Sequence, residues 1–162
     1  MSLSVPPDGG PSPHPIDIVA DAHNVYWVTF DGGDVLSEPI AGGVPPFVIA
    51  SGEDHPHAIA VDDTNVYWTD LGTALSGTGS VKQAPKNARA TPATLVTLSQ
   101  NEKAPWDVAV DGTSVYWTDR ANPGSQEGPH RGDGSGRQPR PDAGSTLRDR
   151  GGCHVRVLDE LR

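Results

Sequence analysis

Histidines and other side chains capable of chemistry gather where three short apolar segments of this sequence begin. His14 precedes the first segment, His55 and His57 precede the second, and Trp106 and Asp107 hold the matching positions of the third. A histidine exchanges its proton near neutral pH, so His57 with His55 could supply acid–base catalysis. Two histidines alone make an incomplete metal site, and we predict no bound metal or cofactor. We favour ligand contact by His14, His57, Trp106 and Asp107 over catalysis.

The three segments belong to an internal repeat. Each copy begins with Pro-x-x, continues with a short stretch of Ile, Val and Ala ending in Asp, and then reaches Val-Tyr-Trp, at residues 15–27, 56–68 and 105–117. The starting prolines lie 41 and 49 residues apart, close to the roughly 40–45 residues of a four-stranded propeller blade. The sequence therefore predicts an all-β fold of four-stranded antiparallel blades.

Each copy of the repeat reads as a β-hairpin that starts a blade. In the second copy, the small and β-branched residues 58–62 suit an inner strand, and residues 66–70 suit its partner after a polar turn. Third and fourth strands are predicted at 34–40 and 46–50 in the first copy, and at 80–84 and 93–98 in the second.

Large aromatic and acidic residues recur at fixed places in the repeat. The recurring residues are Tyr26 and Trp27; Tyr67, Trp68 and Asp70; and Tyr116, Trp117 and Asp119. Rings of this size contribute most of the buried area of a core, so the tryptophans are predicted to pack between blades. Asp70 and Asp119 are predicted to accept hydrogen bonds from the backbone of the adjacent blade. Asp21, Asp62 and Asp111, which precede turns, are predicted to bond the turn backbone rather than a metal.

The Tyr-Trp-Thr-Asp segments at 67–70 and 116–119, each after an apolar strand ending in Asp, resemble YWTD and NHL-type β-propeller repeats. Such repeats occur in the class B repeats of lipoprotein receptors and in many secreted or envelope proteins of bacteria. The first copy departs from the pattern, because Val28-Thr29 stands where Thr-Asp is expected. The resemblance implies a disc of six or seven blades that binds a protein or small molecule on one face, usually without catalysis.

A second, narrower resemblance supports an enzyme as the alternative. The segment Pro56-His57-Ala58-Ile59 is similar to a motif of virginiamycin B lyase-like propellers, in which such histidines perform acid–base chemistry at the centre of the disc. A lyase-like or lactonase-like enzyme using His57 and His55 is therefore the competing hypothesis.

Composition divides the chain into three parts. We expect a disordered segment at 1–12, about two and a half blades at 13–123, and a low-complexity tail at 124–162. Through residue 123 the net charge is −10, and from 124 onward it is +1. All nine Trp, Tyr and Phe residues precede the tail, so the tail has little apolar surface to bury and is predicted to be disordered.

We hypothesise that the tail is further propeller sequence translated in a shifted reading frame. Permitted codons for residues 148–161, moved by one base, encode AIAVDATSVYWTN, which is another copy of the repeat. Blade 3 is then predicted to keep only its first hairpin. An unclosed propeller exposes strand edges and blade faces, which predicts marginal stability or self-association.

The remaining features bear on location and partners. Residues 1–7 lack the charged and apolar regions of a signal peptide, and no apolar run approaches the roughly 18 residues of a membrane span. The family resemblance implies an envelope or secreted location for a full-length parent. Cys153 is single, so no disulfide is predicted. The acidic repeats argue against nucleic acid as a partner, leaving a protein or a small molecule.

Overall fold

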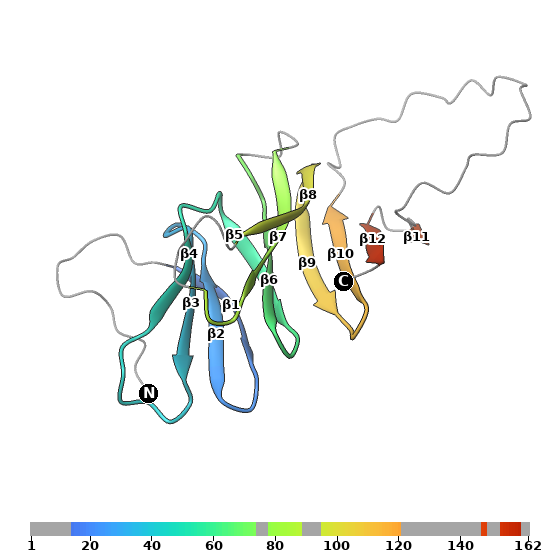
Figure 1. The fold of residues 1–162 in the computed structure, drawn as a ribbon. Coiled ribbons are helices and arrows are strands. Elements are labelled where there is room, and N and C mark those ends of the chain that lie inside the picture. The colour runs from blue at the N-terminus through green and yellow to red at the C-terminus, as the bar shows by residue number, and fades with distance from the viewer. Residues whose placement is uncertain (1–13, 74–77, 89–94, 121–146, 149–152, 160–162) are drawn as a thin grey trace, which may run out of the picture.

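Three antiparallel sheets stand side by side in the computed structural model, and each begins with one copy of the repeat (Figure 1). The structure describes residues 14–73, 78–88, 95–120, 147–148 and 153–159. All regular elements in these residues are β-strands, so none is a helix able to cross a membrane. We call the sheets blades 1, 2 and 3.

Blades 1 and 2 are four-stranded meanders in which each strand pairs with the next along the chain. Blade 1 contains β1 (Pro15–Ala20), β2 (Asn24–Thr29), β3 (Asp34–Pro39) and β4 (Phe47–Ser51). Blade 2 contains β5 (Pro56–Val61), β6 (Asn65–Asp70), β7 (Gly79–Pro85) and β8 (Val96–Glu102). The predicted hairpins and third strands are therefore confirmed.

The last strand of blade 2 lies further along the chain than predicted. Its partner β7 pairs from Gln83 opposite Val96 to Gly79 opposite Glu102. Pairing thus continues through the polar residues 99–102, beyond the end of the predicted strand, because an outer strand need not be apolar on both faces. The predicted residues 93 and 94 lie outside the described part of the chain.

Blade 3 has more strands than the sequence predicted. Its first hairpin is β9 (Pro105–Val110) with β10 (Ser114–Arg120), but β10 also pairs along its whole length with β12 (Cys153–Asp159). The two-residue β11 (Leu147–Arg148) follows on the outside, giving the order β9-β10-β12-β11. The prediction that blade 3 stops after its hairpin is therefore wrong.

The pairing of β12 with β10 has a physical reason in each of the two strands. Without β12, β10 would leave a row of unpaired backbone groups along its outer edge. Val155 and Val157 supply the β-branched residues that suit a strand opposite Thr118 and Tyr116. The other residues of the tail, and the N-terminal segment 1–12, lie outside the described residues.

The core consists of two seams between neighbouring blades. In the seam between blades 1 and 2, fully buried Trp68 packs with residues of both sheets, among them Tyr26, Val35 and Ile49. In the seam between blades 2 and 3, Trp117 packs with Tyr67, Val81 and Val108. Trp27 is also buried, at 7% exposure.

The inner strands lie next to one another in chain order, with β1 against β5 and β5 against β9. Blades 1 and 3 stand at opposite ends of the row, so the propeller is not closed (Figure 1). This arrangement gives every blade two distinct ends. We call the end where the inner strands begin, near residues 14, 57 and 106, the histidine end, and the end with Asp21, Asp62 and Asp111 the aspartate end.

Candidate functional site

The histidine end brings together two of the residues predicted to contact a ligand, one from each side of a blade boundary. The imidazole of His57 in blade 2 lies 4.0 Å, centroid to centroid, from the indole of Trp106 in blade 3. His57 Nδ1 is 2.7 Å from the backbone oxygen of Trp106. A carbonyl oxygen can only accept, so Nδ1 carries the proton and Nε2 is left as an acceptor in the neutral ring.

Arg120 completes this cluster, which we call the His57–Trp106–Arg120 cluster. The guanidinium carbon of Arg120 lies 4.6 Å from the centre of the Trp106 ring, within the range of a cation–π contact. Trp106 remains 39% exposed. Arg120 was not among the predicted site residues, although it directly follows the Tyr-Trp-Thr-Asp segment. Its amide donates to the carbonyl of Ala104, just before the inner strand.

The other predicted residues of this end have separate partners. His14 Nδ1 lies 3.0 Å from Asp31, within blade 1. His55 Nδ1 lies 2.8 Å from Asp54, and its ring is 4.8 Å from that of Phe30. His55 therefore points to different neighbours from His57, and the two do not act as one pair.

Backbone geometry also distinguishes His14 and His55. Each directly precedes the starting proline of an inner strand, and each has a positive φ, 50° and 59°. Non-glycine residues adopt this region at a cost in energy that the surrounding structure must offset. The bonds from the amides of Phe30 and Leu71 to the carbonyls of His14 and His55 hold these turns.

Asp107 has a local role in the structure. Its Oδ1 accepts the amide of Val108 at 2.9 Å, and its own amide donates to Thr118 Oγ1. Among the described residues, no group of three or more His, Cys, Asp or Glu side chains is placed to hold a metal ion.

A buried ionic cluster lies beside Trp68. Lys82 Nζ contacts Glu53 Oε2 at 2.5 Å and Asp70 Oδ2 at 2.9 Å, and the two carboxylate side chains are only 3% and 2% exposed. Ser80 Oγ also donates to Asp70. Burial, together with the charge of Glu53, raises the pKa of Asp70 to about 7 against the opposing effect of Lys82.

The last residue of Tyr-Trp-Thr-Asp has different partners in the two copies, and the predicted bond to the backbone of the adjacent blade is wrong for Asp70. Asp119 Oδ1 accepts the backbone amide of Ala104, in the linker from blade 2, at 2.9 Å. Asp70 bonds side chains of its own blade instead, because β7 places Lys82 opposite Trp68. Glu53 was missed, although Glu53 and Glu102 each stand three residues before the starting proline of an inner strand.

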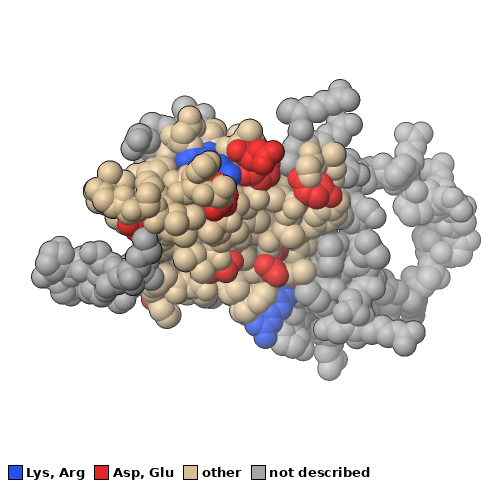
Figure 2. All heavy atoms as spheres, turned by 90° about the horizontal axis from the view of Figure 1, so that it is seen from below, with Lys and Arg blue, Asp and Glu red and all other residues tan. Residues whose placement is uncertain are grey.

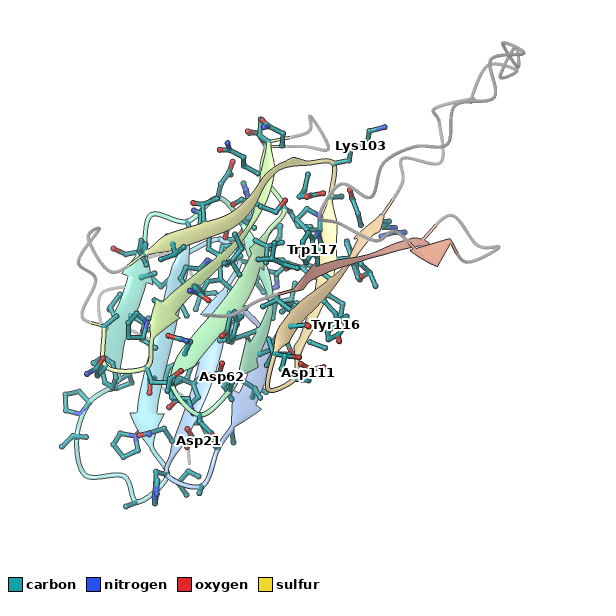
Figure 3. The ribbon with its side chains drawn as sticks, turned by 45° about the vertical axis from the view of Figure 1, so that its right-hand side comes forward. Asp21, Asp62, Lys103, Asp111, Tyr116 and Trp117 are labelled. Atoms are coloured by element: carbon teal, nitrogen blue, oxygen red, sulfur yellow. The ribbon has the colours of Figure 1, made fainter. Side chains whose placement is uncertain are left out.

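The aspartate end repeats one hydrogen-bonded unit in all three blades. One carboxylate oxygen of Asp21, Asp62 or Asp111 accepts two amides of the following turn, as predicted. The other oxygen accepts the hydroxyl of the tyrosine five residues on, at 3.0, 2.6 and 2.9 Å. Figure 3 shows these aspartates along one end of the blades, far from Lys103 at the other.

Comparison with known proteins supports the fold. No family model and no curated protein matches the chain. Among solved structures, a chain in the crystal structure of a nidogen/laminin complex is similar, with a TM-score of 0.55 and 19% sequence identity. The match covers 65% of this chain and 40% of that chain. At this identity the likeness shows a β-propeller fold.

Proposed function

We propose that this chain is a non-catalytic binding module that contacts a protein partner through the His57–Trp106–Arg120 cluster. The single observation that carries the proposal is the tilted contact of the His57 ring with the Trp106 ring across the boundary of blades 2 and 3. Trp106 is exposed there and Arg120 lies over its ring. Tryptophan and arginine are the residues that most often dominate binding energy at protein interfaces.

The arrangement favours binding over acid–base catalysis. His57 uses Nδ1 on a backbone carbonyl, and its aromatic neighbour carries no acid or base. His55 and His14 are each paired with a different carboxylate. The similar propeller from the nidogen/laminin complex belongs to an assembly of proteins, which agrees with a protein partner for this fold.

The proposal can be tested with a random peptide library displayed on phage and selected on the whole chain. Enriched peptides should bind the parent and lose at least about tenfold in affinity for Trp106→Ala. Ile40→Ala is the matched control, because Ile40 is similarly exposed, at 44%, but lies in blade 1. Peptides that bind Trp106→Ala as tightly as the parent would contradict this assignment of the binding surface.

We further propose that the three blades belong to a larger propeller. The hypothesis of a shifted-frame tail after residue 123 rests on its sequence alone, because the pairing of β12 with β10 does not support it. The row of blades is open, with blade 1 at one end, and Ile16 and Ile18 on β1 are exposed. Exposed apolar side chains on the terminal blade support a further blade that packs against it. The exposed face of blade 1 also favours self-association, which sedimentation at several protein concentrations would detect. The lyase-like alternative predicts turnover, which a non-catalytic binding module lacks.

A further inference from the structure

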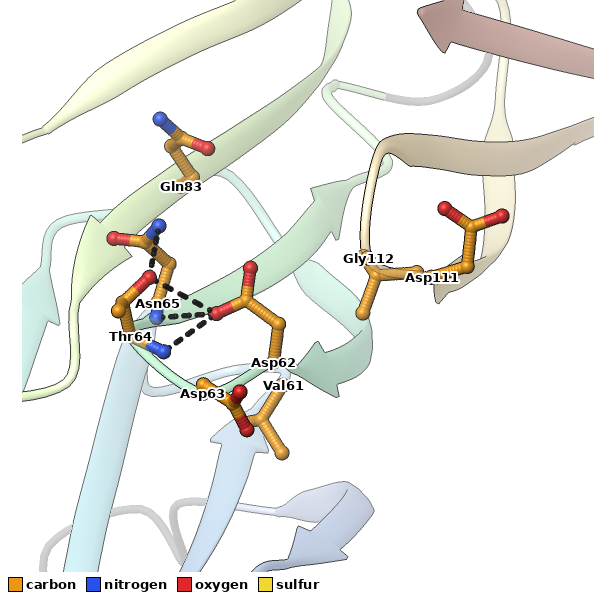
Figure 4. Close-up of a pocket in the computed structure, with 9 residues that line it drawn as sticks. Val61, Asp62, Asp63, Thr64, Asn65, Gln83, Asp111 and Gly112 are labelled. Atoms are coloured by element: carbon orange, nitrogen blue, oxygen red, sulfur yellow. Dashed lines mark hydrogen bonds between the residues drawn. The ribbon is translucent and has the colours of Figure 1, made fainter. Parts of the chain in front are cut away.

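A pocket of about 590 Å³ lies at the aspartate end between blades 2 and 3. Asp62 and Asp63 contribute from one side and Asp111 from the other, with Gln83 on the wall (Figure 4). No described residue that lines the pocket is basic. Seen from below, this end of the molecule carries several acidic groups and few basic ones (Figure 2).

The equivalent position between blades 1 and 2 is already filled. Lys86 follows β7 in blade 2 and reaches back to blade 1, where its Nζ lies 2.7 Å from Asp21 Oδ2. The ammonium also lies 5.6 Å from the centre of the Tyr26 ring. Both charged side chains are largely out of solvent, at 19% and 23% exposure. Lys86 thus occupies the junction between blades 1 and 2 at the aspartate end.

The repeat makes Asp62 the counterpart of Asp21. Asp62 Oδ2 accepts the hydroxyl of Tyr67, as Asp21 Oδ2 accepts that of Tyr26, but no described residue gives Asp62 an ammonium. β12 runs opposite β10 as β7 runs opposite β6, so Asp159 matches Pro85. In the sequence Pro85 is followed by Lys86, whereas Asp159 is followed by Glu160. The sequence therefore offers an acid where blade 2 offers a lysine.

Hydrogen bonds keep the carboxylates around the pocket in the charged form that a cation binds. Burial would raise the pKa of Asp62, but hydrogen bonds from Tyr67, Asn65 and Thr64 outweigh it and lower that pKa. A hydrogen bond from the Thr113 amide, followed by that of Tyr116, lowers the pKa of Asp111 to about 2. Gln83 adds a buried Oε1 with no hydrogen-bond partner among the described residues.

We infer that the pocket at Asp62 binds the primary ammonium group of a lysine side chain supplied by another molecule. The lysines of this chain are Lys82, Lys86 and Lys103. Lys82 and Lys86 are paired with other carboxylates, and Lys103 lies at the opposite end of the blades (Figure 3). The ligand therefore comes from a second copy through its Lys103, or from a different protein, and the chemistry of the site is the same for both.

The experiment uses the whole isotope-labelled chain and Nα-acetyl-lysine methylamide as the probe, followed by NMR. We expect saturable shifts of the Thr64 and Asn65 amides, which bond Asp62. The Nε-acetylated probe, which has no charge, is the matched control and should bind at least about tenfold more weakly. Asp62→Asn should weaken binding of the charged probe to the same degree, whereas Asp31→Asn in blade 1 should not.

A second variant tests the equivalence of the two junctions. Lys86→Met empties the Asp21 site, so the probe should then also shift the His23 and Asn24 amides, which bond Asp21. Equal binding of both probes, binding unchanged by Asp62→Asn, or absence of a second site in Lys86→Met would overturn the inference.

Two further measurements distinguish the sources of the lysine. If dilution of the chain alone shifts the Thr64 and Asn65 amides, and Lys103→Met removes that effect, a second copy supplies the lysine. If dilution has no effect while the probe binds, the lysine belongs to a different protein. Trp106→Ala should leave probe binding unchanged in both cases, because it alters the histidine end.

Discussion

Asp17 of blade 1 accepts a hydrogen bond from the backbone amide of Ile59 in blade 2, with an Oδ2–N distance of 2.9 Å. Its other oxygen accepts the amide of Ile18 on its own strand. One carboxylate thus joins two neighbouring inner strands whose backbones do not pair with each other. Asp107 repeats the local half of this arrangement in blade 3, while blade 2 has Ala58 at this position.

The seam between blades 1 and 2 predicts a large effect of removing Trp68. Trp68→Ala should lower the free energy of unfolding by about 3–5 kcal/mol, because the fully buried indole would leave a cavity. Urea denaturation followed by circular dichroism measures this. Trp106→Ala, at a site 39% exposed, is the control and should cost much less; equal stability of Trp68→Ala and the parent would rule out the blade packing.

The buried ionic cluster predicts a large loss of unfolding free energy when its lysine is replaced. Lys82→Met leaves Glu53 and Asp70 buried without their shared cation, which typically costs about 3–5 kcal/mol of unfolding free energy. Lys103→Met, at an exposed site, should change stability by no more than about 0.5 kcal/mol. Similar unfolding midpoints for the two variants would show that the cluster does not stabilise the fold.

The raised pKa of Asp70 predicts a pH dependence with a definite sign. The folded chain keeps this proton up to about pH 7, whereas an unfolded aspartate loses it near pH 4. Between these values the folded state binds more protons, so the stability due to Asp70 is complete below about pH 4 and falls as pH rises toward 7.

Asp70→Asn should remove this slope, since asparagine does not titrate. Urea unfolding of the parent and the variant at several pH values measures the difference between them. The hydrogen bonds that lower the pKa values of Asp62 and Asp111 act below about pH 4 and do not overlap this range. A difference between parent and variant that grows with pH in the opposite sense would contradict the assignment.

Catalysis is the competing function, and it predicts turnover. We expect the whole chain to open neither cyclic depsipeptide antibiotics nor simple lactones, because His57 donates to a backbone carbonyl and has no acidic partner among the residues that the structure describes. Product analysis by mass spectrometry with and without added divalent metal tests this. Turnover that His57→Ala abolishes and Ile40→Ala preserves would replace the binding proposal with the lyase-like one.

The tail predicts a specific nucleotide sequence. If residues after 123 are read in a shifted frame, the DNA one base away should continue with a Val-Tyr-Trp-Thr segment and further strands. Sequencing of this region decides the question. A gene with no such segment in either alternative frame would make β12 a native third strand of blade 3.

Much of the fold was predictable because its repeat is local. The alternation of strand residues and the turns at Asp21, Asp62 and Asp111 depend on neighbours in sequence, so the hairpins lie where predicted. Pairing of β12 with β10 was not predictable, since more than thirty residues separate them. No local pattern indicates a partner so distant in the chain.

The site was predictable only in part, for a related reason. His57 and Trp106 were both identified, but their contact depends on how blades 2 and 3 meet. Arg120 and Glu53 were missed because their contacts are with residues distant in sequence. Arg120 lies over the Trp106 ring, and Glu53 accepts a hydrogen bond from the Trp68 indole. Comparing the copies of the repeat position by position, for example Glu53 with Glu102, was the signal that could have found the buried acids.

The bond between Asp17 and the Ile59 amide forms only if neighbouring inner strands pack as adjacent propeller blades. Amide hydrogen exchange of the whole chain should show a slowly exchanging Ile59 amide. In Asp17→Ala that amide should exchange at least about tenfold faster, while the Val61 amide elsewhere on β5 changes little. A fast Ile59 amide in the parent, or one that Asp17→Ala leaves unchanged, would contradict the packing of blade 1 against blade 2.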